Sequence, residues 1–228
     1  NEFLVGSRLD NLASCYVAIE ALTECATATG AKSLDNDDGV NIIALFDHEE
    51  VGSSSNTGAG SPIMRDAVTR ISNCFMANED SEVFKVALSK SMIFSVDMAH
   101  AIHPNYASKH EKQHSPQMNK GVVIKSNANQ RYATTGVTGF ITRELARRAS
   151  IPIQEFVVRN DCPCGSTIGP KISENTGIRA IDLGLPQLSM HSIREMSGVN
   201  DLVTARELFV AFFKDFSKID ESLKLTGK

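Results

Sequence analysis

Apolar residues recur along the chain in two alternating patterns: short continuous runs, and longer stretches with helical spacing. Continuous apolar runs bounded by polar residues are typical of buried strands. Segments of this kind predict strands at 40–47 (VNIIALFD), 92–99, 121–127, 153–159 and 176–184. The first residues, NEFLVG, also read as extended chain that leads into a helix.

Stretches with helical spacing lie between these runs. Residues 10–29 carry apolar positions about one helical turn apart, and Asp10 or Asn11 is a candidate N-cap. Further helices are predicted at 61–77, with Pro62 in the first turn, near 80–90, at 135–149 and at 199–219. Residues 100–119 are polar and rich in histidine, which favours a long loop. Strands that alternate with helices predict an α/β fold, a three-layer sandwich around a mixed, largely parallel central sheet.

Length and composition limit the possible functions. The 228 residues suffice for one large α/β domain, and 42% hydrophobic with 22% charged residues is typical of a globular protein. A net charge of −4 provides no basic field for nucleic acid. No apolar stretch approaches the roughly 18 residues that cross a membrane, and the N-terminus lacks signal-peptide features. Five irregularly spaced cysteines favour reduced thiols in the cytoplasm.

Acidic residues and a histidine follow the predicted strands. Glu49 and Glu50 come directly after strand 40–47, Asp97 ends the run MIFSV, and His191 lies shortly after AIDLG. Asp10 lies where the first segment turns into its helix. Ligand sites in α/β sheets gather at the carboxyl ends of strands. Carboxylates combined with imidazole suit a catalytic zinc ion, or two ions that share one carboxylate.

Each of these residues also has an ordinary structural interpretation. An adjacent pair such as Glu49 and Glu50 is common in solvated surface turns, Asp10 could simply cap its helix, and His191 could be structural. Asp97 is harder to explain in this way, because an unpaired charge near buried surface is costly. The pair Cys162 and Cys164 is too closely spaced for the usual structural zinc site.

Six motifs together carry a resemblance to a known family. They are GSRLDN (6–11), FDHEEVGSSS (46–55), SVDMAHAIHPNY (95–106), IKSNANQRYAT (124–134), CPCGSTIGP (162–170) and LSMHSIREM (188–196). In this order they closely resemble the aspartyl aminopeptidases of the M18 metallopeptidase family. Each motif alone is weak, but the joint match runs from end to end of the chain.

The resemblance implies a role for each site residue. Asp10 would bridge two zinc ions, Glu50 and His191 would ligate the first, and Asp97 would ligate the second. Glu49 would be the general base. Lys125 would receive the acidic side chain of the substrate's first residue, although in GVVIKSN it could instead be the solvent-facing end of a strand. His100 would lie near the scissile carbonyl, and the segment Gly165, Ser166 and Thr167 would form part of the pocket wall.

The same resemblance sets expectations for the rest of the protein. The family has a further zinc-binding histidine in a His-x-Asp motif, and this motif does not occur here. We therefore expect residues 1–228 to form a single catalytic-domain fragment without the family's oligomerisation domain or its first strands. The parent enzyme would remove N-terminal Asp or Glu from peptides and form homo-oligomers, in the cytoplasm or with a vacuolar association. The alternatives are a related two-zinc aminopeptidase or deacylase, and a non-catalytic assembly module.

Overall fold

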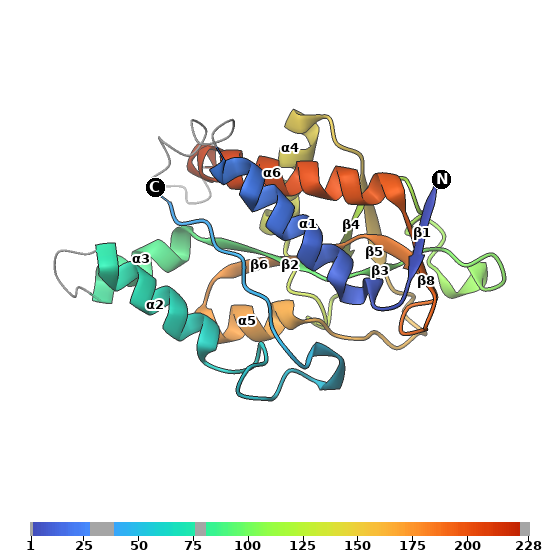
Figure 1. Ribbon diagram of the computed structural model, residues 1–228, viewed down its shortest axis with the longest axis horizontal. Coiled ribbons are helices and arrows are strands. Elements are labelled where there is room, and N and C mark those ends of the chain that lie inside the picture. Colours follow the sequence, from blue (N-terminus) through green and yellow to red (C-terminus); the bar gives the residue numbers. More distant parts are fainter. Residues whose placement is uncertain (1, 28–38, 76–80, 224–228) are drawn as a thin grey trace.

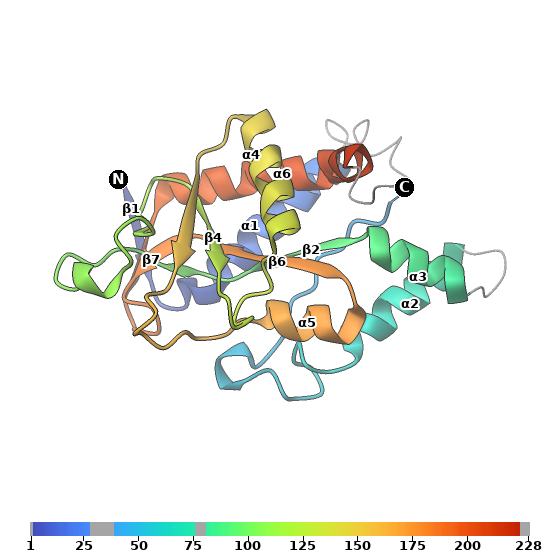
Figure 2. The same cartoon turned by 180° about the vertical axis from the view of Figure 1, so that it is seen from behind.

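The computed structural model describes residues 2–27, 39–75 and 81–223 (Figures 1 and 2). Its helices lie on both sides of β-structure, as the α/β prediction requires. The strands are β1 (Phe3–Gly6), β2 (Met92–Val96), β3 (Ala99–His100), β4 (Val122–Ser126), β5 (Ile153–Val157), β6 (Arg179–Gly184), β7 (Pro186–Leu188) and β8 (Glu195–Gly198). The helices are α1 (Leu9–Ala26), α2 (Ile63–Phe75), α3 (Ser81–Lys90), α4 (Gly136–Ala149), α5 (Ile168–Thr176) and α6 (Val199–Ser222), with short 3-10 turns at Glu49–Val51 and Ala107–Lys109.

The larger strands form one mixed sheet in the order β2-β6-β4-β5. The outer pairs, β2 with β6 and β4 with β5, are parallel, whereas β6 and β4 are antiparallel. The register places Asp182 of β6 between Ser95 of β2 and Lys125 of β4. The prediction of a mixed, largely parallel sheet is confirmed, and four of the five predicted strands form here.

A second sheet, in the order β1-β8-β7-β3, extends the structure toward the N-terminus (Figures 1 and 2). The sequence predicted extended chain at β1 but gave no sign of β7 and β8. These two strands are three and four residues long and include polar residues, so they form no apolar run. The strand β3 pairs with β7, and its two residues are the last residue of the predicted strand 92–99 and the first residue of the predicted loop 100–119.

The helices complete a three-layer arrangement. Helices α1, α4 and α6 pack on one face of the mixed sheet, and α5 packs on the other face with α2 against it (Figures 1 and 2). Fully buried side chains from the sheet and the first helical layer fill the space between them, among them Ile124, Ile181, Ile141 and Leu208. Phe94 of β2 stacks on Phe212 of α6, with 3.8 Å between ring centroids. None of the helices in the described part is long and apolar enough to cross a membrane.

Two local predictions are wrong. Residues 40–47 form no strand, and no described strand pairs with them. Val40 and Leu45 are each 55% exposed, and Ile43 alone of this run packs against the main core. An apolar run becomes a strand only where a partner satisfies its backbone groups. The second error is the helix cap, because Arg8 occupies the N-cap position of α1 and no side chain caps the helix.

Candidate metal and substrate site

Three of the predicted metal ligands lie together although their positions in the chain are far apart. Asp10 is at the start of α1, Glu50 is in the 3-10 turn Glu49–Val51, and His191 is in the loop between β7 and β8. The Nε2 atom of His191 lies 3.3 Å from Oδ2 of Asp10 and 3.0 Å from Oε2 of Glu50. One ligand atom from each of the three residues lies within 4.8 Å of the others. We call these three residues the metal cluster.

The turn that carries Glu49 and Glu50 is held by its own backbone. His48 has a left-handed conformation (φ 63°), and its carbonyl accepts a hydrogen bond from the Ser53 amide at 2.8 Å. The Ser53 carbonyl in turn accepts from the Gly60 amide at 3.0 Å. A side chain at Gly58 would collide with the Ser53 main chain, which explains the glycine there. The turn lies on the surface, as expected if Glu49 and Glu50 belonged to an ordinary solvated turn. The Glu50 carboxylate nevertheless points to His191.

Asp97 and Lys125 lie next to the metal cluster and contact each other. Lys125 is only 2% exposed, so its alternative interpretation as a solvent-facing lysine is wrong. Its Nζ donates to the carbonyls of Asp97 and Met98, both at 3.1 Å, and lies 3.4 Å from Oδ2 of Asp97. The same ammonium lies 5.3 Å from the centre of the Tyr132 ring. Asp97 thus lies between Lys125 and the cluster, because its carboxylate also interacts with that of Asp10.

The proximity of so many carboxylates changes their acidity. Burial, and then the charge of Asp97, raise the pKa of Asp10 to about 8. Burial also raises the pKa of Glu49, with further increases from Asp97 and Glu50, while Lys125 and His191 oppose the shift. His100 is an exposed residue, but partial loss of solvent around its ring and then the charge of Lys125 lower its pKa. Repulsion of this kind among carboxylates is what a bound cation would relieve.

The residues predicted for the pocket wall lie in the loop between β5 and α5, not in the segments that carry the metal cluster. Gly165 and Ser166 are exposed, and the Ser166 hydroxyl donates to the Arg131 carbonyl at 3.1 Å. Thr167 is buried, and its hydroxyl donates to Asp182 at 2.5 Å. Both hydroxyls therefore bond within the protein. A nearby cavity of about 350 Å³ is lined by residues of the loops that follow β4 and β5, among them Asn127, Arg131, Arg159 and Cys164.

Two buried acids that sequence analysis missed support these groups. Glu195 is 2% exposed and accepts hydrogen bonds from the backbone amides of Asp10 and His191. Asp182 is fully buried and accepts from Ser95 at 2.6 Å, from Thr167, and from the Ala133 amide at 2.6 Å. Asp182 could have been found from its position inside the apolar run AIDLG, because a charge in a buried strand needs hydrogen-bond partners. Nothing comparable marked Glu195.

The donor set fits zinc. Carboxylate oxygens and an imidazole nitrogen, with no thiolate, are the ligands of catalytic zinc sites, which keep one position open. Asp10, Glu50 and His191 would hold one ion. The contact between Asp10 and Asp97 would let Asp10 share a second ion with Asp97.

Comparison with known proteins agrees with this chemistry. Residues 1–213 match the family described as Aminopeptidase I zinc metalloprotease (M18). The chain belongs to the M18 family. A protein of Ricinus communis named "Probable aspartyl aminopeptidase" is 54% identical over 97% of this chain, and aspartyl aminopeptidase 1 of Schizosaccharomyces pombe is 47% identical over 97%. The chain spans 44% and 46% of the length of these two relatives.

Solved structures of family members share the fold. A cryo-EM structure of the Ape4 and Nbr1 complex contains a chain that is 46% identical, with a TM-score of 0.93, covering 99% of this chain and 42% of the other. The structure of the S. cerevisiae mApe1 dodecamer contains a chain that is 31% identical, with a TM-score of 0.87, covering 99% of this chain and 49% of the other. The α/β fold predicted from the alternation of strands and helices is therefore that of M18 aminopeptidases.

Proposed function

We propose that this M18 protein removes N-terminal Asp and Glu residues from peptides by hydrolysis at a site for two zinc ions. The observation that carries the proposal is the buried Lys125 ammonium, which lies 3.4 Å from Asp97 and so beside the metal cluster. A fixed buried cation discriminates strongly between acidic and neutral side chains. The relatives named aspartyl aminopeptidase support the same specificity.

The residues divide the chemistry between them. Asp10, Glu50 and His191 would hold one zinc ion, and Asp10 would share a second ion with Asp97. When bound, zinc supplies Lewis-acid polarisation of the scissile carbonyl and makes water a stronger nucleophile at neutral pH. Glu49 takes a proton from the attacking water and returns it to the nitrogen of the leaving amine. The raised pKa of Glu49 suits a group that must both accept and donate a proton near neutral pH.

The acid-recognition step falls to Lys125. Two of its contacts are short bonds to main-chain carbonyls, whereas the contact to the Asp97 carboxylate is longer. A substrate carboxylate would replace this third contact and form a charge-assisted pair. His100 would lie beside the scissile carbonyl, and Gly165, Ser166 and Thr167 would line the pocket. We further propose a homo-oligomeric cytoplasmic protein, supported for assembly by the dodecamer of the related mApe1.

The test uses the full-length protein and a matched series of short peptides with N-terminal Asp, Glu, Leu or Ala. Peptides with N-terminal Asp and Glu should be hydrolysed, a chelator should abolish the activity, and zinc should restore it. Comparable rates for the Leu peptide would favour a related aminopeptidase of different specificity. Stoichiometric zinc binding without turnover of any peptide would favour a non-catalytic assembly module.

A further inference from the structure

Glu195 is a buried carboxylate whose two oxygens are both used on the backbone of the metal cluster. Oε2 accepts the backbone N–H of Asp10 at 3.0 Å, and Oε1 accepts the backbone N–H of His191 at 2.7 Å. The two amides are 181 residues apart in sequence, and Glu195 itself belongs to β8. One side chain therefore joins the start of α1 to the loop between β7 and β8 at the point where both supply a metal ligand.

Both of these backbone segments are irregular, so neither has regular secondary structure to hold it. Asp10 interrupts the helical conformation of α1, with φ −81° and ψ 106°. His191 is left-handed, with φ 65°, in an exposed loop. In such segments the backbone N–H must find an acceptor outside the helix or sheet pattern. A carboxylate is suited to this place because both of its oxygens accept and neither donates.

We propose that Glu195 is a positioning residue for the metal site, which fixes Asp10 and His191 at the spacing that a shared zinc ion requires. This inference rests on the proposed function, since it assigns a support to the same site. Both carboxylate oxygens of Glu195 already accept hydrogen bonds from these two backbone amides, so we assign it no contact with substrate or metal. It acts through the backbone of two ligands, in the way that outer-shell groups commonly orient the ligands of a metal.

Glu195→Gln tests this role with a side chain of nearly the same shape. The amide keeps one acceptor oxygen but presents an NH₂ group to one of the two backbone N–H groups, so one contact becomes repulsive. Zinc affinity of the full-length protein, measured by chelator competition, should fall about 10–100-fold. Glu195→Asp, which is one methylene shorter, should fail to restore the affinity because it cannot reach both amides.

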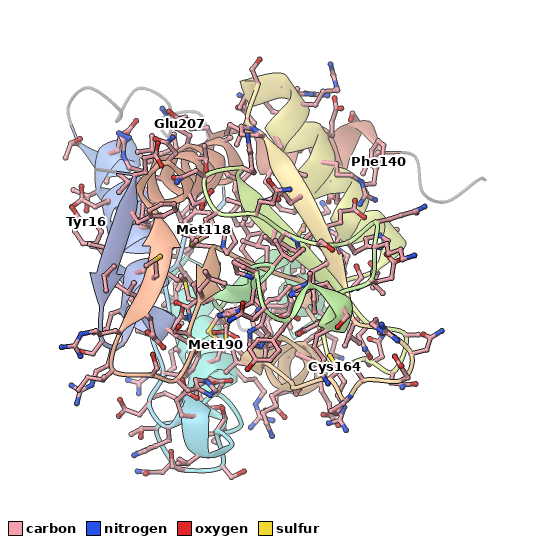
Figure 3. All side chains as sticks on the ribbon, turned by 90° about the vertical axis from the view of Figure 1, so that its right-hand side faces the viewer. Tyr16, Met118, Phe140, Cys164, Met190 and Glu207 are labelled. Atoms are coloured by element: carbon pink, nitrogen blue, oxygen red, sulfur yellow. The ribbon has the colours of Figure 1, made fainter. Side chains whose placement is uncertain are left out.

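Glu207→Gln provides the matched control. Glu207 is an exposed glutamate of α6, and Figure 3 shows it near the top of the molecule, well above Met190, the neighbour of His191 in sequence. It loses the same charge and should leave zinc affinity unchanged. An affinity for Glu195→Gln within experimental error of the wild type, in a folded protein, would overturn the proposed positioning role.

A second measurement does not depend on whether the variants fold. In the zinc-free wild type, residue-resolved hydrogen exchange should find the backbone amides of Asp10 and His191 protected. The His191 amide should exchange more slowly than that of Ile193, a residue 76% exposed in the same loop. Exchange of Asp10 and His191 at the rate of unstructured amides would show that Glu195 does not hold them, and would overturn the inference.

The outcomes separate this inference from the proposed function. If the wild type binds zinc and hydrolyses acidic peptides while Glu195→Gln is unchanged, the positioning role fails and the function stands. If the wild type binds no zinc although both amides are protected, the zinc-peptidase function fails. Glu195 would then be a structural link alone, which also overturns its role at a metal site.

Discussion

The two halves of the proposed site are built in opposite ways. In the metal cluster, the side chains of Glu50 and His191 are 52% and 63% exposed, and several carboxylates face one another. The second half, which we call the lysine pocket, consists of Lys125, Tyr132, Thr134 and Asp182. Lys125 is buried there among main-chain carbonyls and under the Tyr132 ring.

This difference shows which half depends on a ligand. The pocket satisfies its polar groups internally, since Thr134 donates to the Lys125 carbonyl at 2.6 Å and Asp182 accepts bonds from three segments. The cluster leaves like charges in proximity, and a cation would remove that repulsion. We therefore expect changes in the cluster to affect zinc binding and turnover, and changes in the pocket to affect stability and substrate selectivity.

The largest effect is expected for Glu49→Gln. This change removes the proton acceptor but none of the proposed zinc ligands, so kcat should fall about 10²–10⁴-fold. Steady-state rates on an aspartyl peptide, together with metal analysis, measure the effect. A variant with normal zinc content and near wild-type kcat would remove Glu49 from the role of base.

His191→Ala should reduce zinc affinity, because it deletes the imidazole that lies near both carboxylates of the cluster. The loss should exceed the roughly 10–100-fold that follows removal of an outer-shell group. Chelator competition measures this affinity. Because His191→Ala leaves the lysine pocket unaltered, the variant saturated with zinc should keep its preference for acidic over neutral peptides. Loss of this preference would contradict the separation of the two halves.

Asp182→Asn should affect the stability of the fold rather than zinc affinity. Replacing one carboxylate oxygen by an NH₂ group leaves at least one of the buried donors, from Ser95, Thr167 or Ala133, without its acceptor. The free energy of unfolding should fall by about 1–3 kcal/mol. Urea denaturation of the zinc-free protein measures the loss. Unchanged stability, or a fall in zinc affinity as large as that of His191→Ala, would contradict the assignment of Asp182 to the pocket.

The smallest effect is expected for an acid outside both halves. Glu144 of α4 pairs with Arg147 and Arg148 on the surface, and these arginines lower the pKa of its carboxyl to about 2. Glu144→Gln should leave zinc affinity and selectivity unchanged. A change in zinc affinity or in peptide selectivity would show that the site responds to the net charge of the protein. The local contacts of the metal cluster and the lysine pocket would then not be what sets these two quantities.

The sequence predicted most of the central sheet and its helices because their patterns are local. The runs 92–99, 121–127 and 153–159 each contain a strand, the helical stretch 135–149 contains α4, and the stretch 199–219 covers all but the last three residues of α6. The run 40–47 has the same appearance but forms no strand, since strand formation depends on a partner that the run itself does not specify. Short strands such as β7 and β8 have too few residues to form a periodic pattern.

In the site, too, the sequence predicted the residues that carry a local pattern and missed those that do not. Asp10, Glu50 and His191 were predicted from their positions after strands and within motifs, and the structure brings them within 4.8 Å. Their supports could not be predicted in this way. Glu195 acts through backbone amides, which leave no mark in a sequence, and Asp182 gave only the signal of an acid in an apolar run. The proximity of these three residues does not test their role as ligands, and the roles assigned to all the site residues, including Asp97, Lys125, Glu49, His100 and the segment 165–167, stay predictions.

The most direct test of the proposed function is the selectivity of Lys125→Met. The substitution keeps an unbranched side chain, one atom shorter than lysine, but removes the cation. The ratio of kcat/KM for an aspartyl peptide to that for a leucyl peptide should therefore fall by about 30–1000-fold, corresponding to roughly 2–4 kcal/mol for a lost buried charge pair. Turnover of the leucyl peptide by the zinc-loaded variant provides the control for folding. An equal loss on both peptides, with the ratio unchanged, would contradict acid recognition by Lys125.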